Sequence, residues 1–331
     1  MSISDLPPEL VHRILELAVD RLPPSLKVRA DTLKRFALVG HAWRVPAQIL
    51  LEQKVQIASY AMAKRYMDRP QQRRRTIVDE LEIFFDFVSP EDDEFYPLTE
   101  SILRAFLDRG DMSINSLHLR SALFMNAFDV SLLRLPAFKD LTCLRLEMPI
   151  EPPPDSAAMP FSLSRLAINE MMDLSLDLFR ILLSNARLSA LDIFTIKGGA
   201  PLHRRVLEAA PSLTETLRHV SIASHWTTTL GATLVDLVAS CENLATLTLT
   251  GIDFAQVVAL VATVRSRLVT FDFTVARSVE WTDGEARDAV DRFLALPSLE
   301  SAREITATQR LDAKSGVSPS RLEEIRGRAL P

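Results

Sequence analysis

Glycine is scarce in this sequence, which has nine glycines among 331 residues. Loops that cradle phosphate groups need glycine, because the backbone itself must come close to the ligand. The pair Gly198-Gly199 follows an expected strand but lacks the other glycines of a nucleotide-binding motif. We interpret this pair as a turn and expect no nucleotide cofactor.

Cysteine is also rare. Cys143 and Cys241 lie about a hundred residues apart, and two thiols cannot form a disulfide framework. Their neighbours do not have the spacing of zinc ligands, so no metal and no other cofactor is expected. A reducing compartment is the natural setting for such a chain, which predicts a cytoplasmic and/or nuclear protein.

Signal, membrane and nucleic-acid features are missing as well. Residues 1–5 do not predict a secretory signal, and no apolar run reaches the length of a membrane-spanning helix. The formal net charge is −5, so the strongly basic balance typical of general nucleic-acid binders is absent. The short run Arg73-Arg74-Arg75 is interpreted as a solvated loop. We therefore expect neither nucleic acid nor a membrane as a partner.

The first 52 residues predict three short helices around one small core. Pro7 and Pro8 suit the first turn of a helix, where a missing N–H costs little, and Pro23-Pro24 would end it. A second helix is predicted from about Asp31 to Val39, and Pro46 suits the first turn of a third. Leu10, Ile14, Leu15 and Ala18 recur at helical spacing and are expected to form one apolar face of the first helix. In the second helix, Leu33, Phe36 and Ala37 are expected to point inward.

The spacing of this segment resembles the adaptor-binding module of F-box proteins. The resemblance rests on Leu6-Pro7 at the start of the first helix and on the later step Leu38-Val39-Gly40-His41-Ala42-Trp43. The continuation Trp43-Arg44-Val45-Pro46-Ala47 is similar to F-box-like proteins of the fungal, mushroom-type group. In one respect the chain departs from the family, because the stretch from Asp20 to Thr32 is longer than the usual connection between the first two helices.

The F-box resemblance implies a partner. Family members bind a Skp-type adaptor, which bridges to a cullin scaffold in a ubiquitin ligase. Three short helices bury only a modest fraction of their surface, so some apolar side chains are expected to face a second chain. The alternative is a helical cap whose apolar residues only seal the next domain. The positions that match the family's adaptor contact are Leu6, Pro7, Leu10, Ile14, Leu15, Leu38, Val39 and Trp43.

From about Lys54 to Ala302 a short apolar pattern recurs. Leu-x-x-Leu-x-Leu, or a close variant, begins at residues 114, 141, 163, 188, 217, 244 and 268, which gives a spacing of 22 to 29 residues. This period is that of leucine-rich repeats. Val78/Leu81/Ile83 and Val55/Ile57 suggest earlier units, and Leu299 to Ile305 suggests a degenerate last one. Between the strands, helices are expected near residues 176–183, 234–238 and 257–261.

The predicted fold class is an α/β repeat. A three-helix F-box (1–52) is followed by an irregular leucine-rich-repeat solenoid (53–306), with parallel strands on the concave side and helices on the convex side, and then by a polar C-terminal tail or cap (307–331). Segments 89–97 and 149–160 are expected to be exposed loops. The polar turn residue of regular repeats is missing, which predicts irregular turns; its positions hold Ala122, Pro149, Met171, Ile196, His225, Ile252 and Ala276.

The outward positions of the strands define a candidate binding face, because solenoids commonly bind extended partners there. The earlier units carry several cations at these positions, whereas the later units carry small hydroxyl-bearing residues. For any single residue, a plain solvated surface is the alternative. The candidate contacts for a target protein are His118, Arg120, Arg145, Arg165, Asn169, Asp192 and Phe194.

These patterns favour a non-catalytic protein. The leading hypothesis is a substrate-recognition subunit of a Skp–cullin–F-box ubiquitin ligase, and the first alternative is a binding scaffold with an F-box-like cap and no ligase role. A hydrolase or metal enzyme is the second alternative, since His203, His219 and His225 lie within 23 residues. Neither His-Glu-x-x-His nor Gly-x-Ser-x-Gly accompanies these histidines, which argues against catalysis.

Overall fold

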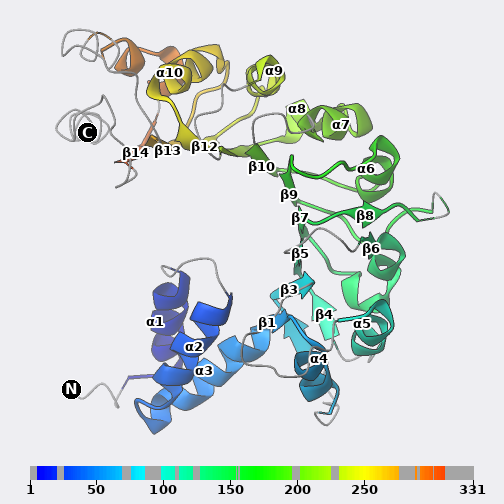
Figure 1. Ribbon diagram of the computed structural model, residues 1–331. Coiled ribbons are helices and arrows are strands. Elements are labelled where there is room, and N and C mark those ends of the chain that lie inside the picture. Colours follow the sequence, from blue (N-terminus) through cyan, green and yellow to red (C-terminus); the bar gives the residue numbers. More distant parts are fainter. Residues whose placement is uncertain are drawn as a thin grey trace. The chain divides into compact units, whose positions relative to one another are not determined.

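The computed structural model describes residues 6–20, 26–68, 76–85, 98–108, 112–121, 127–153, 155, 157–195, 202–224, 231–275, 288, 291–300 and 302–309. The chain divides into two compact units, residues 1–153 and residues 154–331. Each unit is an α/β arrangement built on parallel strands (Figure 1). The division falls within the predicted segment 53–306.

Three N-terminal helices, α1 (Pro8–Asp20), α2 (Leu26–Ala37) and α3 (His41–Gln53), pack around a small core of their own (Figure 1). Leu6, Phe36, Ala37, Trp43 and Leu51 cover the edges of this core and are themselves partly buried. A core of this size stabilises a module only modestly, because so few side chains leave water. Its fully or almost fully buried members are Val11, Leu15, Val19, Leu33, Ala47 and Leu50.

Helix α1 has two apolar faces rather than the single apolar face that we predicted. Val11, Leu15 and Val19 recur every four residues and are buried, whereas Leu10 and Ile14 are exposed. Successive residues of an α-helix lie about 100° apart, so Leu10 and Leu15 are roughly 140° from one another around the axis. They cannot share a face, so the prediction of one apolar face that contains Leu10, Ile14 and Leu15 was wrong.

Helix α2 begins at Leu26 rather than near Asp31. Much of the stretch that we interpreted as a long connection is therefore helical, and that prediction was wrong. Leu33 is buried while the neighbouring Lys34 and Arg35 are exposed, so the helix is amphipathic despite its charge. Charged side chains cover its outer face and hid the helical pattern in the sequence.

Helix α3 also begins earlier than predicted. It starts at His41, which places Pro46 inside the helix rather than in its first turn. Proline has no N–H, so Pro46 cannot donate to the carbonyl of Ala42 as other residues of a helix interior do. Ala47 and Leu50 follow on the buried side of the helix, and their contacts with the core offset this lost hydrogen bond.

The first unit contains four longer strands, β1 (Lys54–Ile57), β3 (Glu80–Phe85), β5 (Ser116–Ser121) and β7 (Cys143–Glu147), which pair in this order and in parallel. Helices α4 (Tyr60–Met67) and α5 (Glu100–Leu107) and the 3-10 helices η2 (Val130–Arg134) and η3 (Pro136–Phe138) lie between them in the chain. Two short parallel pairs accompany them, β2 (Thr76–Val78) with β4 (Met112–Ile114) and β6 (Phe128–Asp129) with β8 (Ile150–Glu151).

The second unit contains six strands, β9 (Arg165–Asn169), β10 (Ala190–Thr195), β11 (His219–Ser224), β12 (Thr246–Ile252), β13 (Thr270–Val275) and β14 (Glu304–Gln309). They pair in chain order and in parallel. Helices α6 (Leu176–Leu182), α7 (Leu202–Ala209), α8 (Leu213–Thr216), α9 (Ala232–Ser240), α10 (Phe254–Thr263) and η4 (Pro297–Leu299) connect them. These helices lie on one side of the strands (Figure 1).

Side chains alternate along the strands of both units. Leu247 and Leu249 of β12 are buried, for example, whereas Thr246 and Thr248 between them are partly exposed. A strand presents successive residues to opposite faces, so the apolar pattern is buried on one side and the other residues form an open face. The predicted strands and the helices predicted between them are confirmed in the described residues, and the parallel pairing of the strands is as expected.

Strand β12 is irregular near its C-terminal end, at the position Ile252 where the polar turn residue of regular repeats is missing. The pairing of β12 with β13 shifts register between Thr250 and Ile252. Gly251, between them, has φ of +74°, and a Cβ at this position would collide with the carbonyl oxygen of Ser224. Only glycine fits such a backbone without strain.

Several predictions concern residues outside those described, namely segments 73–75, 89–97, 198–199 and 310–331 and the turn positions Ala122, Ile196, His225 and Ala276. The predicted loop at 149–160 is more ordered than expected, since Ile150 and Glu151 pair with β6 and Met159 is buried. Strand β14 continues to Gln309, past the predicted end of the repeats at residue 306.

Candidate functional site

Large apolar side chains gather on the outer surface of the three N-terminal helices. The turn between α2 and α3 exposes Leu38 and Val39, with 86% and 64% of their surfaces accessible. Among the described residues, twelve large hydrophobic side chains are exposed, and eight of these belong to this module. They are Leu10, Ile14 and Leu17 of α1, Val28 of α2, Leu38 and Val39 of the turn, and Val45 and Ile49 of α3.

The residues that the F-box resemblance singled out fall into two groups. Pro7, Leu10, Ile14, Leu38 and Val39 are exposed. The remaining three belong to the module's own packing: Leu15 is fully buried, Leu6 packs against the core, and Trp43 stacks on Phe36 with ring centroids 5.8 Å apart. A partner can therefore contact the first group directly, whereas Leu15 can act on a partner only by holding the helices together.

Our sequence reasoning missed four exposed apolar residues of the module: Leu17, Val28, Val45 and Ile49. Helical spacing could have found three of them. Leu17 continues the line of Leu10 and Ile14 along α1, and Val45 and Ile49 are four residues apart in α3. The prediction that α3 begins near Pro46 placed Val45 outside the helix and concealed this second line.

The helical module is joined to the strands of the first unit through a partly buried ion pair. Arg29 of α2 lies 3.4 Å from Glu80 of β3, measured from Nη1 to Oε2, and both side chains are largely covered. A pair that is shielded from water is screened less by salt than an exposed one. Arg29 therefore fixes α2 against the first strands.

The open face of the first unit carries a network of paired charges. Arg120 donates to Glu82 at 2.9 Å and approaches Glu147 at 3.2 Å. Arg145 donates to the same Glu147 at 2.7 Å. His118, between them, has its ring nitrogens 3.8 Å from Glu82 and 3.4 Å from Glu147. These three candidates for target binding, Arg120, Arg145 and His118, thus already lie against two carboxylates.

Burial opposes ionisation of Glu147, but this network outweighs it. Hydrogen bonds and charges from His118 and Arg145 lower the pKa of Glu147 from 4.5 to about 2. Glu82 has 2% of its surface accessible and also accepts a hydrogen bond from Gln56 Nε2 at 3.1 Å. Our sequence analysis did not name Glu82 or Gln56, because their partners lie 26 to 38 residues away and meet them only through strand register.

A similar pairing occurs on the open face of the second unit. Arg165 Nε donates to Asp192 Oδ2 at 2.6 Å, and His219 Nε2 lies 3.5 Å from the other oxygen of Asp192. Burial raises and the hydrogen bonds from His219 and Arg165 lower the pKa of Asp192, with a net decrease. Two further candidates have other roles: Asn169 is buried and accepts the N–H of Met171 at 3.0 Å, and Phe194 is half-buried.

Potential metal ligands do not cluster in the described residues. Within the part of the chain that the structure describes, no group of three or more His, Cys, Asp or Glu side chains could hold a metal ion. Burial raises the pKa of the Cys241 thiol to about 11, which leaves it a weak nucleophile at neutral pH. Of the three histidines noted in the sequence, His225 lies outside the described residues, and the other two lie apart on α7 and β11.

His203 belongs to a buried polar chain behind the strands of the second unit. Its Nδ1 lies 2.5 Å from Glu170 Oε1, and its Nε2 lies 2.9 Å from Thr233 Oγ1. Glu170 follows β9, His203 belongs to α7 and Thr233 to α9. A carboxylate, an imidazole and a hydroxyl thus bond in series and link three successive elements. His203 and Glu170 are both almost inaccessible to solvent. We therefore interpret this series of hydrogen bonds as part of the packing of the second unit.

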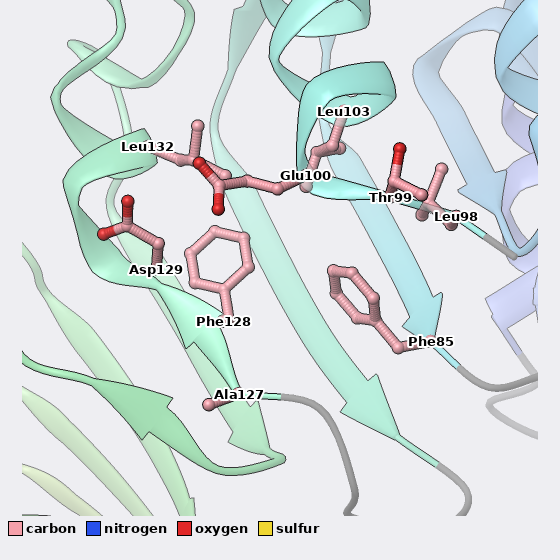
Figure 2. Close-up of a pocket in the computed structure, with 9 residues that line it drawn as sticks. All are labelled: Phe85, Leu98, Thr99, Glu100, Leu103, Ala127, Phe128, Asp129 and Leu132. Atoms are coloured by element: carbon pink, nitrogen blue, oxygen red, sulfur yellow. The ribbon is translucent and has the colours of Figure 1, made fainter.

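A cavity of about 310 Å³ lies in the first unit (Figure 2). Residues of β3, α5, β6 and η2 line it, together with the residues that precede α5. Our sequence analysis did not predict it, because its walls come from three segments of the chain that no motif connects.

The chain was compared with known proteins. No protein-family model matches it, and no curated protein sequence matches it. In the part of the chain that is described, no helix has both the length and the apolar character needed to cross a membrane.

Proposed function

We propose that the chain is a substrate-recognition subunit of a Skp–cullin–F-box ubiquitin ligase. In this proposal helices α1 to α3 form an F-box-like module that binds a Skp-type adaptor. The strands and helices that follow form divergent leucine-rich repeats, whose open face holds a target protein. The protein would act in the cytoplasm or nucleus, where these ligases work.

The observation that carries the proposal is the exposed apolar surface of the three-helix module. The module has its own core, and yet eight large hydrophobic side chains remain outside it. Exposed apolar groups that gather on one small module are typical of a surface that a partner covers. The Leu-Pro and Leu-Val-x-x-x-Trp steps of the F-box resemblance lie in the same segment and favour a Skp-type adaptor as that partner.

The repeat architecture supports the second half of the proposal. Strands recur at the leucine-rich-repeat period and pair in parallel, and their open faces carry polar and hydroxyl-bearing side chains. Such faces bind extended partners in solenoid proteins. Because Arg120, Arg145 and Arg165 are paired with carboxylates, we expect a target to bind through hydrogen bonds to paired groups rather than by neutralising free cations.

The proposed mechanism is proximity. A receptor that holds a target and an adaptor at once raises the local concentration of the target near the conjugating enzyme of the assembly. The chain itself performs no bond chemistry in this mechanism. Its contribution is to carry two binding surfaces on one polypeptide.

An adaptor-binding experiment tests the proposal. Purified full-length protein is mixed with a Skp-type adaptor, and complex formation is measured by isothermal titration calorimetry. The double variant Ile14→Asp/Leu38→Asp places charges at exposed apolar positions without touching the core, and it is expected to weaken binding at least a hundredfold. Met171→Asp/Val269→Asp alters two exposed apolar residues of the second unit and serves as the matched control.

Two results would reject the proposal. If the unaltered protein binds no Skp-type adaptor, the module is a cap and the protein is a binding scaffold without a ligase role. If the control variant loses binding as much as the module variant, the apolar surface of the helices is not the contact. Circular dichroism checks that both double variants keep the fold.

A further inference from the structure

The cavity of the first unit lies beside the C-terminal end of β3 and the N-terminal end of α5 (Figure 2). Phe85, Phe128 and Leu103 form part of its wall, and the two phenyl rings meet edge to face with centroids 6.2 Å apart. Its volume of about 310 Å³ is at the lower end of the range for small-molecule sites. The lining residues are Phe85, Leu98, Thr99, Glu100, Leu103, Ala127, Phe128, Asp129 and Leu132.

Most of the described wall of this cavity is apolar and closely packed. Phe85, Leu98, Leu103, Phe128 and Leu132 are all at least nine-tenths buried, so their packing against the surrounding elements holds them in place. A ligand that enters a preformed apolar site avoids the cost of ordering its walls. The shape of the site thus suits one compact apolar group.

The polar part of the lining has one sign of charge. Among the described lining residues it contains the carboxylates of Glu100 and Asp129 and no cationic side chain. Figure 2 shows Glu100 reaching over the Phe128 ring toward the side of the cavity from which Asp129 projects. The two carboxylates come from different elements, α5 and β6, and stand on the same apolar cavity.

Both carboxylates retain acceptor capacity. Asp129 accepts the backbone N–H of Ser131 at 2.7 Å and its hydroxyl at 2.5 Å, which uses one lone pair on each oxygen. Glu100 lies 3.5 Å from Arg104 in an exposed pair, which contributes little and is readily exchanged. A ligand with several N–H donors can therefore bond to both carboxylates without displacing the hydrogen bonds from Ser131 to Asp129.

The geometry points to a site for a primary ammonium group on a compact apolar body. The apolar body would occupy the space between Phe85, Leu103 and Phe128, and the ammonium would donate to Glu100 and Asp129. Arylalkylamines and the first residue of a protein that begins with a large apolar side chain share this chemistry. The inference does not rest on the proposed ligase function, because neither the adaptor-binding helices nor the target-binding candidates line the cavity.

The test is calorimetric titration of the full-length protein with phenethylamine at neutral pH, in the absence of any adaptor. We expect saturable binding, and binding by 2-phenylethanol, which has the same body and no charge, is expected to be at least tenfold weaker. Glu100→Gln and Asp129→Asn should each weaken the binding of phenethylamine about tenfold, since each removes one charge-assisted hydrogen bond. Ala127→Phe, at an exposed lining position, should block the cavity and abolish binding.

Asp108→Asn is the matched control, because Asp108 ends α5 but does not line the cavity. An unchanged affinity in this variant excludes a general effect of negative charge. The inference is overturned if phenethylamine shows no saturable binding, if 2-phenylethanol binds equally well, or if Asp108→Asn weakens binding as much as Glu100→Gln.

Peptides distinguish the two sources of the ligand. A peptide that begins with phenylalanine and has a free amino terminus is compared with its acetylated form. Tighter binding of the free peptide than of phenethylamine would assign the site to protein amino termini. Binding of phenethylamine but of neither peptide would assign it to small amines, and both outcomes support an ammonium site.

Discussion

At the scale of single residues, Glu147 organises the open face of the first unit. It accepts from Arg145 at 2.7 Å and lies within 3.4 Å of both His118 and Arg120. Any anionic group that approached Arg120 or Arg145 would compete with a carboxylate that is already in place. The charges of this face therefore stabilise the strands first and contribute to recognition only through their remaining hydrogen-bonding groups.

The lowered pKa of Glu147 predicts a loss of stability in acid. The folded pKa of about 2 lies below the ordinary value of 4.5, so the stabilisation is fully present above pH 4.5 and is lost as the pH falls toward 2. Glu147→Gln should reduce the free energy of unfolding at pH 7 by on the order of 2 kcal/mol. Urea denaturation between pH 7 and pH 3 should show a smaller decline for the variant than for the unaltered protein.

Gly251 is predicted to tolerate no other residue. Gly251→Ala would place a methyl group against the carbonyl oxygen of Ser224 and hold a side chain at φ of +74°. We expect a loss of at least about 2 kcal/mol in the free energy of unfolding, from backbone strain at residue 251 and from displacement of the Ser224 backbone. Gly231→Ala is the control, since a Cβ at that position meets only the Thr233 hydroxyl at 3.7 Å. Equal stabilities of the two variants would contradict this account.

Leu15 and Leu10 lie on different sides of α1, so truncation of the two side chains should have different effects on stability. Leu15→Ala removes a fully buried side chain and is expected to cost about 3 kcal/mol of stability. Leu10→Ala removes an exposed one, so stability should change by less than about 0.5 kcal/mol. Under the proposed function, Leu10→Ala should still weaken adaptor binding. Thermal denaturation and adaptor titration of both variants separate the two roles.

At the scale of secondary-structure elements, the chain of Glu170, His203 and Thr233 joins three successive segments behind the strands of the second unit. Glu170→Ala would leave the buried His203 without its carboxylate partner. A buried polar group that loses its hydrogen bond costs about 1–3 kcal/mol, and we expect a destabilisation in this range. Asp177→Ala, which breaks an exposed pair with Arg180, is the control and should have little effect on chemical denaturation.

The helices and strands were largely predictable, because every second residue is apolar in a strand that is covered on one side. Leu247 and Leu249 of β12 are an example. The starts of α2 and α3 were missed for two different reasons. Charged residues obscured the amphipathic pattern after Leu26, and Pro46, which suits a helix start, instead lies inside a helix.

The candidate site was less predictable than the elements. The exposure of Leu38 follows from a turn that joins two helices, and a local pattern can indicate it. The pairing of Arg120 with Glu82 depends on the register of β3 and β5, which is not written in either strand alone. The cavity between Phe85 and Phe128 depends in turn on how three segments pack, and no spacing in the sequence encodes its volume.

At the scale of the whole molecule, eight exposed apolar side chains on one module should make the isolated chain prone to association. Co-expression with a Skp-type adaptor is expected to raise its soluble yield. Adaptor at a hundred times its Kd should also stabilise the folded protein by about 2.7 kcal/mol. Size-exclusion chromatography and thermal denaturation, with and without adaptor, measure both effects. An unchanged yield and an unchanged melting temperature would argue for the scaffold alternative.

The strict alternation along the strands separates residues that are required for folding from residues that can vary. Leu247 and Leu249 must be kept for the protein to fold, whereas Thr246 and Thr248, on the opposite side of the same strand, are free to vary without opening a void. Gene duplicates could exchange such outward residues one at a time, and each intermediate would remain a folded protein. The architecture thus allows new binding preferences to evolve through a series of viable single steps.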